Sequence, residues 1–235
     1  MLLSDLFEQL TIGELSQLSL SGIDEIGISE CNYIKVVPHI QLGLTELHKR
    51  FPVRMQEVIV QQYDSITDYE LNSKFAVTNK ESEAPIKYIE DSIFEPFVNN
   101  VLRIESIHDE DGQELFLNDS GEYWSVHTSS YNTIHVPLPE KENVMSVMYR
   151  ADHDKIPIIE LDPYTTEINV PLSLLEALLF YVAARVYTNL NSDGAISDGN
   201  NYMQKFEASC VRAEEANTIN RDNTANKKLD KMGWV

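Results

Sequence analysis

Two short clusters of acidic and histidine residues are the parts of this chain whose residue types and spacing could do chemistry. The first is His108-Asp109-Glu110-Asp111 and the second is Asp152-His153-Asp154. Imidazole and carboxylate groups bind divalent metals, and a bound metal can activate water for hydrolysis. A metal-dependent hydrolase that uses His108, Asp109, Asp152 and His153 is therefore one functional alternative.

Both clusters also have a structural explanation. Asp111 precedes Gly112, and an Asp-Gly pair is a strong signal for a tight β-turn. If the second cluster lies in a strand, the acids at 152 and 154 point away from the side of the sheet that carries His153. The chain has no glycine-rich phosphate loop, serine nucleophile elbow or histidine-glutamate metalloprotease motif. We therefore expect no catalytic residue, no metal ligand and no cofactor.

The charge balance restricts the class of partner. The chain has 235 residues and a formal net charge of −20. An acidic protein is repelled by phosphate backbones and by anionic membrane surfaces, so we expect neither ordinary nucleic-acid binding nor membrane association. The first ten residues lack the basic start of a secretory signal, which favours a cytoplasmic origin.

Helical patterns occupy the beginning of the chain. Residues 3–20 predict a helix with a break, at which Thr11 and Glu14 could form a capping box that restarts it. A second helix is expected from 33 to 50, since its apolar residues recur at helical spacing. Cys31 and Cys210 lie far apart in sequence, and we expect both to be reduced, small apolar residues of the helical body.

Helical patterns return at the end of the chain. Residues 172–187 are apolar nearly all round, and Ser173 with Glu176 could cap the start of this helix. Such a helix is buried on most sides, in a bundle or partly against a neighbouring subunit. A polar loop is expected at 191–199, followed by a last helix over 200–218.

The middle of the chain, between Pro52 and Pro171, reads as β. Short runs rich in β-branched residues alternate with turn signals, which is typical of a small antiparallel sheet, sandwich or barrel. One helical turn is expected within 92–99, and the relation of His127 to His135 stays open. Strands are expected at 53–63, 69–77, 101–107, 114–117, 131–136, 144–150, 156–161 and 166–170.

These patterns predict an α+β fold: a helical bundle built from both termini with an inserted antiparallel β domain, either a sandwich or a small barrel. The expected parts are a first helical part at 1–52, the β domain at 53–170, a second helical part at 171–220 and a C-terminal segment at 221–235. This C-terminal segment has four basic and two acidic residues, a net charge of +2 on an acidic protein. It is either a solvated terminus or a segment that becomes ordered on a partner.

With these elements in view, the chain resembles the head-to-tail adaptor (connector) proteins of tailed bacteriophages. The likeness covers most of the chain in order and includes no catalytic motif. The stretches that carry it are LTIGELSQLSL at 10–20, IQLGLTELHKRFP at 40–52, EVIVQQYDSITDY at 57–69, VMYRADHDKI at 147–156, LLEALLFYVAARVYTNLNSDG at 174–194 and NNYMQKFEASCVR at 200–212.

The resemblance implies a virion structural protein rather than an enzyme. It implies a dodecameric ring under the portal protein that continues the DNA channel, lets genomic DNA pass without specific binding and presents a surface to the next tail or nozzle protein. The ring would be assembled in the host cytoplasm and lie in the neck of the virion. A tail-completion or neck protein elsewhere in the stack is a second alternative. By the same resemblance, the portal-binding residues lie in the C-terminal segment: Arg221, Lys227, Lys228, Lys231, Met232 and Trp234.

Overall fold

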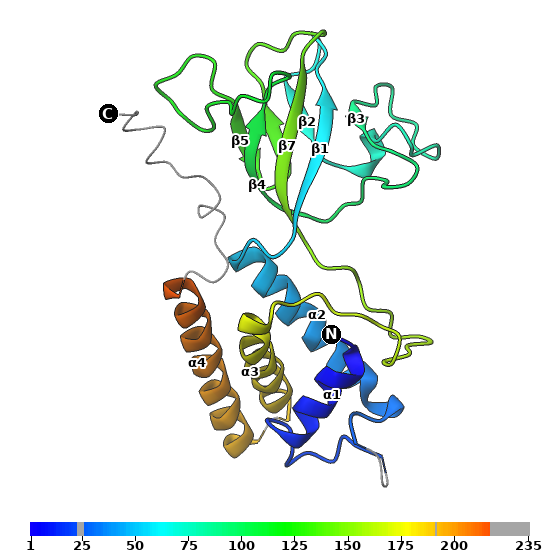
Figure 1. The fold of residues 1–235 in the computed structure, drawn as a ribbon, viewed down its shortest axis with the longest axis vertical. Helices are drawn as coiled ribbons and strands as arrows, with labels where there is room; N and C mark the ends of the chain where they lie inside the picture. The colour runs from blue at the N-terminus through cyan, green and yellow to red at the C-terminus, as the bar shows by residue number, and fades with distance from the viewer. Residues whose placement is uncertain (23–25, 191, 217–235) are drawn as a thin grey trace, which may run out of the picture. The chain divides into compact units, whose positions relative to one another are not determined.

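The computed structural model describes residues 1–22, 26–190 and 192–216, and the chain divides into two compact units. The helical unit combines Met1–Val53 with the chain from His153 onward, and the β unit is Arg54–Asp152. In Figure 1 the blue helices from the start of the chain pack beside the yellow and orange helices from its end. The predicted α+β class is therefore confirmed, with antiparallel sheets inserted between the two helical parts.

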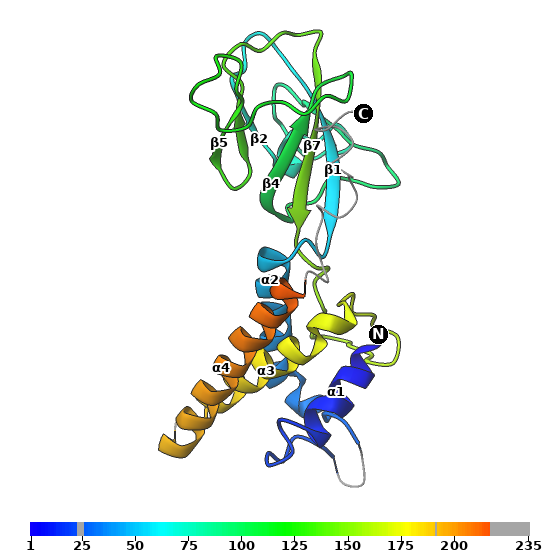
Figure 2. The same cartoon turned by 60° about the vertical axis from the view of Figure 1, so that its left-hand side comes forward.

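The helical unit is organised around its third helix. This helix packs against both α2 and α4 (Figure 2). Its Ala177, Leu178, Val182 and Ala183 are fully buried, which confirms the expectation of a helix enclosed on most sides. The helices are α1 (Leu3–Ile12), α2 (Tyr33–Arg50), α3 (Leu172–Thr188) and α4 (Asp193–Glu215), with a short 3-10 helix, η1 (Glu30–Asn32), before α2.

Close approach between helices depends on two glycines. A Cβ at Gly43 of α2 would lie 2.8 Å from Leu178 and 2.9 Å from the ring of Tyr181. A Cβ at Gly199 of α4 would lie 2.5 Å from the hydroxyl of Thr188. The backbones at both crossings therefore come closer than any larger residue permits. Among the described helices, none is both long and apolar enough to cross a lipid bilayer.

Two expected helix starts are wrong. Thr11 lies in the last turn of α1, where its hydroxyl donates to the carbonyl of Phe7 at 2.9 Å, and the chain beyond forms turns instead of a new helix. Ser173 does not cap α3, because Pro171 occupies the cap position. Glu176 instead accepts hydrogen bonds from Ser209 and Arg212 of α4. The capping-box pattern was a poor indicator here, because Thr11 and Glu176 make other hydrogen bonds.

The fourth helix begins earlier than expected. Its first residue is Asp193, so the predicted loop at 191–199 is wrong. The hydroxyl of Ser192 caps it by accepting from the amide of Ala195 at 3.4 Å. Glycines within 193–199 made this stretch resemble a loop, but Gly199 is needed for packing against α3.

The β unit contains two antiparallel sheets that share one apolar core. The four-stranded sheet has the order β3-β1-β7-β4 and the three-stranded sheet the order β2-β6-β5, so neither closes into a barrel. Buried Val60, Tyr69, Ile134 and Val147 come from both sheets. The strands are β1 (Met55–Gln61), β2 (Asp68–Glu70), β3 (Ile89–Glu90), β4 (Val101–His108), β5 (His127–Ser130), β6 (Thr133–His135) and β7 (Val144–Ala151), with a 3-10 helix, η2 (Ser73–Phe75), after β2.

Several expected β-domain elements are absent from the part of the chain that the structure describes. Residues 114–117 form only isolated bridges, and 92–99 contain no helix, although the amide of Glu95 donates to the carbonyl of Ser92 at 3.2 Å in a single turn. Residues 156–161 and 166–170 are not strands. The strands β3 and β5 were not expected; they are short, and β5 is polar throughout, so neither has the apolar alternation that marks a strand.

The predicted end of the β domain at residue 170 also differs from the structure, in which the β unit ends at Asp152. Residues 153–170 belong to the helical unit because they pack on its first helices. Ile156 and Ile168 are buried in the helical core. The amide of Leu3 donates to the carbonyl of Thr166 at 2.9 Å, which ties this connection to the start of α1.

Candidate functional site

The predicted portal-binding residues all lie outside the described residues: Arg221, Lys227, Lys228, Lys231, Met232 and Trp234. The structure does show how the helix before them is held. Arg50, the last residue of α2, binds Glu207 and Glu214 of α4. The end of α4 is therefore attached to the end of α2.

The first acid-histidine cluster is a turn. Asp109 Oδ1 accepts the backbone amides of Asp111 and Gln113 at 3.0 and 2.8 Å. Gly112 has a φ of +77°, a backbone conformation that favours glycine. His108 is the last residue of β4. Turn formation therefore explains why Asp109 and Gly112 occur at these positions.

The second cluster lies where the β unit ends. His153 places Nδ1 2.7 Å from the carbonyl oxygen of Asp154 and Nε2 3.0 Å from that of Gln41. In the ladder between β4 and β7, His108 pairs with Ser146, whereas Val101 pairs with Ala151, the neighbour of Asp152. His108 and Asp152 are thus at opposite ends of the ladder, about 20 Å apart along the strands. The structure does not bring the hydrolase residues of the β unit together.

The structure settles the relation between His127 and His135, which the sequence did not predict. Both belong to a row of polar residues that crosses the three-stranded sheet. His127 of β5 pairs directly with His135 of β6, which pairs in turn with Asp68 of β2. Nδ1 of His135 lies 3.0 Å from Oδ1 of Asp68. Within the described residues, no group of three or more His, Cys, Asp or Glu side chains could hold a metal ion. The row therefore reads as a cross-strand polar ladder.

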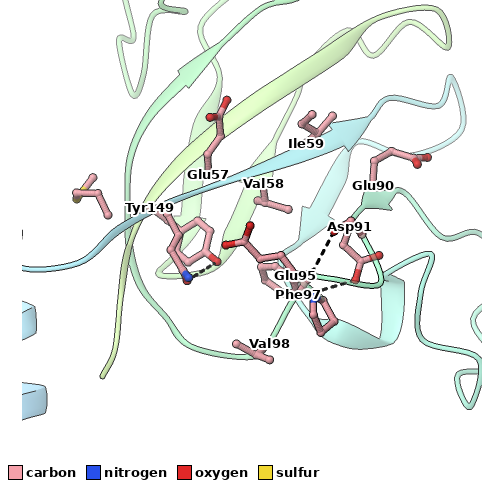
Figure 3. Close-up of a pocket in the computed structure, with 13 residues that line it drawn as sticks. Glu57, Val58, Ile59, Glu90, Asp91, Glu95, Phe97, Val98 and Tyr149 are labelled. Atoms are coloured by element: carbon pink, nitrogen blue, oxygen red, sulfur yellow. Dashed lines mark hydrogen bonds between the residues drawn. The ribbon is translucent and has the colours of Figure 1, made fainter. Parts of the chain in front are cut away.

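A groove of about 470 Å³ lies along β1 in the β unit (Figure 3). One wall is β1 from Met55 to Ile59, and the other is the loop from Glu90 to Val98. Tyr149 also lines it, and its hydroxyl donates to the side-chain oxygen of Gln56 at 3.1 Å. Burial raises the pKa of Tyr149 to about 12, so its phenol is neutral at physiological pH.

Asp91 shapes the loop wall of the groove. Its carboxylate accepts the backbone amide of Thr78 at 2.9 Å, that of Phe97 at 2.9 Å and the hydroxyl of Thr78. Burial, the largest influence, raises the pKa of Asp91, but these hydrogen bonds together outweigh it and hold the pKa below the usual value. The ionised side chain therefore fixes the path of the chain after β3.

The charge and the flanks of the groove are distinctive. Its lining contains four acidic residues and no basic one. Beside it, the side chains of Ile93 and Phe94 are 83% and 98% exposed, and Ile59 is 44% exposed. Exposed apolar side chains next to an acidic hollow are typical of a surface that binds protein rather than nucleic acid. The acidic lining residues are Glu57, Glu90, Asp91 and Glu95.

Sequence reasoning missed this groove because its residues lie in two segments, 55–59 and 90–98, that look unrelated along the chain. The run Glu90-Asp91-Ser92-Ile93-Phe94, with its adjacent acidic and apolar residues, was the available signal. Comparison with protein-family models and with curated proteins gives no match for this chain.

Proposed function

We propose that this chain is a head-to-tail adaptor of a tailed bacteriophage, a structural protein without catalytic activity. Copies would form a dodecameric ring under the portal protein and provide the attachment site for the next tail or nozzle protein. The ring would be assembled in the host cytoplasm and belong to the neck of the virion. The observation that carries the proposal is the ordered likeness described above, and its segments coincide with packed elements of the fold.

The agreement between the stretches that carry the likeness and the packed elements of the fold is clearest in the helical unit. The stretch at 40–52 covers the part of α2 that contains Gly43, and the stretch at 174–194 covers nearly all of α3. These two helices approach each other closely at Gly43. The stretch at 200–212 lies within α4. The likeness thus falls on residues that make the helical core, where substitution is most restricted.

The charge supports the proposed channel. A ring of subunits that each carry a net charge of −20 repels the phosphate backbone, so genomic DNA passes without being retained. No observation favours the hydrolase, because His108 and Asp152 lie at opposite ends of one strand ladder. The absence of specific DNA binding is a further part of the proposal.

In the proposed assembly, the C-terminal segment binds the portal. It is basic and contains Trp234, a residue type that often anchors interfaces. One such short segment by itself binds weakly, but a ring multiplies the attachments.

The test is truncation after Asn220, with portal co-sedimentation and thermal unfolding as the two measurements. The proposal predicts that portal binding is lost while the melting temperature falls by no more than about 4 °C, the shift for about 1 kcal/mol in a chain of this size. Full portal binding by the truncated chain would contradict the role of the segment. A ring that binds another neck component instead of the portal would favour the alternative neck protein.

A further inference from the structure

One edge of β1 is open beside the groove. The carbonyl of Arg54 accepts from Ala151, and the amide of Gln62 donates to Asn143, so even-numbered residues of this strand face β7. The amide of Gln61 donates to Tyr88, so odd-numbered residues face β3. Backbone groups alternate along an antiparallel strand, and those of Met55 and Glu57 therefore face the β3 side.

Strand β3 does not reach these two residues. Its pairing with β1 ends at Ile59 opposite Glu90. Beyond that point Asp91 turns the chain away to form the loop wall of the groove. Among the described residues, Met55 and Glu57 have no strand partner on this side. An open edge of this kind is a template for an added strand.

We infer that the C-terminal segment, residues 221–235, binds in this groove of its own chain as a strand added to β1. The inference goes beyond the proposed function and does not require a portal protein. Charge complementarity supports this occupant, since a segment of net charge +2 meets a lining with four acidic and no basic residues. Lys227 and Lys231 flank Leu229 on one face of an extended chain, so basic and apolar contacts can be made together.

Chain connectivity places the groove within reach. Arg50 binds Glu214, and Met55 follows Arg50 by five residues, a separation of at most about 18 Å. From Glu214 to Lys227 an extended chain spans up to about 45 Å. The segment therefore reaches the groove in any arrangement that the short connection allows. A tether of this length gives an effective concentration in the millimolar range, which favours binding within one chain over binding between copies.

Binding in the groove and binding to a portal would exclude each other, because both use the same basic residues. The groove would thus hold the C-terminal segment until a partner with a higher affinity takes it. This arrangement also covers an open sheet edge, which otherwise favours association between copies.

Hydrogen exchange at the amide of Glu57 tests the inference in the full chain without a portal. The variant Lys227→Glu, Lys228→Glu, Lys231→Glu should exchange this amide about tenfold faster, as expected when a tethered segment with a dissociation constant of about 0.1 mM is released. Charge reversal in the groove, Glu90→Lys with Glu95→Lys, should restore protection to that variant. Glu110→Lys, an exposed turn residue elsewhere in the β unit, is the matched control and should not restore it.

Equal exchange in the parent chain and the lysine variant would overturn the inference. Protection that rises with protein concentration would overturn binding within one chain and indicate contact between copies. Neither result bears on the portal, whose binding is measured separately by co-sedimentation.

A second pair of variants separates strand addition from charge attraction. Glu57→Pro removes the amide that faces the open edge but leaves the hydrogen bonds to β7, whereas Glu57→Ala keeps that amide. Backbone amides within the C-terminal segment should be protected in the alanine variant and lose about tenfold of that protection in the proline variant. Equal protection in both, with the melting temperatures unchanged, would rule out strand addition.

Discussion

The guanidinium of Arg50 binds the carboxylate of Glu214 through two nitrogen–oxygen contacts of 2.6 and 3.3 Å. A third contact of 2.7 Å joins Arg50 to Glu207. The last residue of α2 therefore holds the final turns of α4, at the point from which the C-terminal segment continues. Both proposals for that segment depend on this starting point.

Replacing Arg50 tests how firmly the end of α4 is held. Arg50→Lys keeps one charge but loses the two-pronged contact, so amides in the last turn of α4 should exchange faster. Because the partners are partly exposed, we expect a loss of only about 0.5–1 kcal/mol in the free energy of unfolding. Arg103→Lys, which changes an exposed arginine of β4 in the β unit, is the control and should leave the last turn of α4 unchanged. No change in exchange at Arg50→Lys would contradict the assigned contact.

Two glycines of α4 should respond in opposite ways to alanine. Gly199→Ala places a Cβ 2.5 Å from Thr188 Oγ1 and 3.0 Å from the carbonyl of Ala184, so it should destabilise the chain by about 1–3 kcal/mol. Gly194→Ala meets no atom within 4 Å and should be neutral or stabilise by up to about 1 kcal/mol. Chemical denaturation measures both. Similar effects from the two substitutions would mean that α3 and α4 do not approach closely at Gly199.

Asp91 should make the β unit sensitive to acid. Its folded pKa lies below the ordinary value of 3.8, so its contribution to stability is full above that value and is lost as the pH falls through the folded pKa. Asp91→Asn should cost about 1–2 kcal/mol at neutral pH, because three hydrogen bonds to an ionised group are weakened. The difference between the parent chain and the variant should shrink below pH 3.8. A constant difference down to strongly acidic pH would contradict this role.

The two thiols should differ in reactivity. Both belong to the helical unit, where Cys31 is exposed and Cys210 is fully buried. Burial raises the pKa of Cys210 to about 11, so the reactive thiolate is scarce at neutral pH. Iodoacetamide should therefore modify Cys31 in the native chain and Cys210 only after unfolding. Equal native labelling would show that the end of α4 opens readily.

The sequence alone predicted the helices and strands whose buried apolar residues recur at a regular spacing. The bounds of α2 and nearly those of α3 follow from apolar residues at helical spacing, and β1, β4 and β7 follow from alternation with turn signals between them. The predicted boundary of the β domain at residue 170 was wrong. The segments 156–161 and 166–170 have the residue pattern of strands, but their Ile156 and Ile168 are buried in the core of the helical unit. Local pattern shows that a residue is buried without showing which element covers it.

The candidate site was hidden for a related reason. The groove exists because β3 ends at Glu90 and because Asp91 accepts hydrogen bonds from Thr78 and Phe97, which lie 13 and 6 residues away along the chain. No sequence motif marks the end of β3 or the hydrogen bonds of Asp91. The pairing of His127 with His135 likewise required the register of a hairpin whose strands are short and polar.

Electron microscopy of the purified chain mixed with its portal protein tests the central claim most directly. The adaptor proposal predicts closed rings, stacked on the portal along a common axis with a continuous central channel. A chain that stays monomeric and separate from the portal, at concentrations where the portal itself is intact, would contradict it.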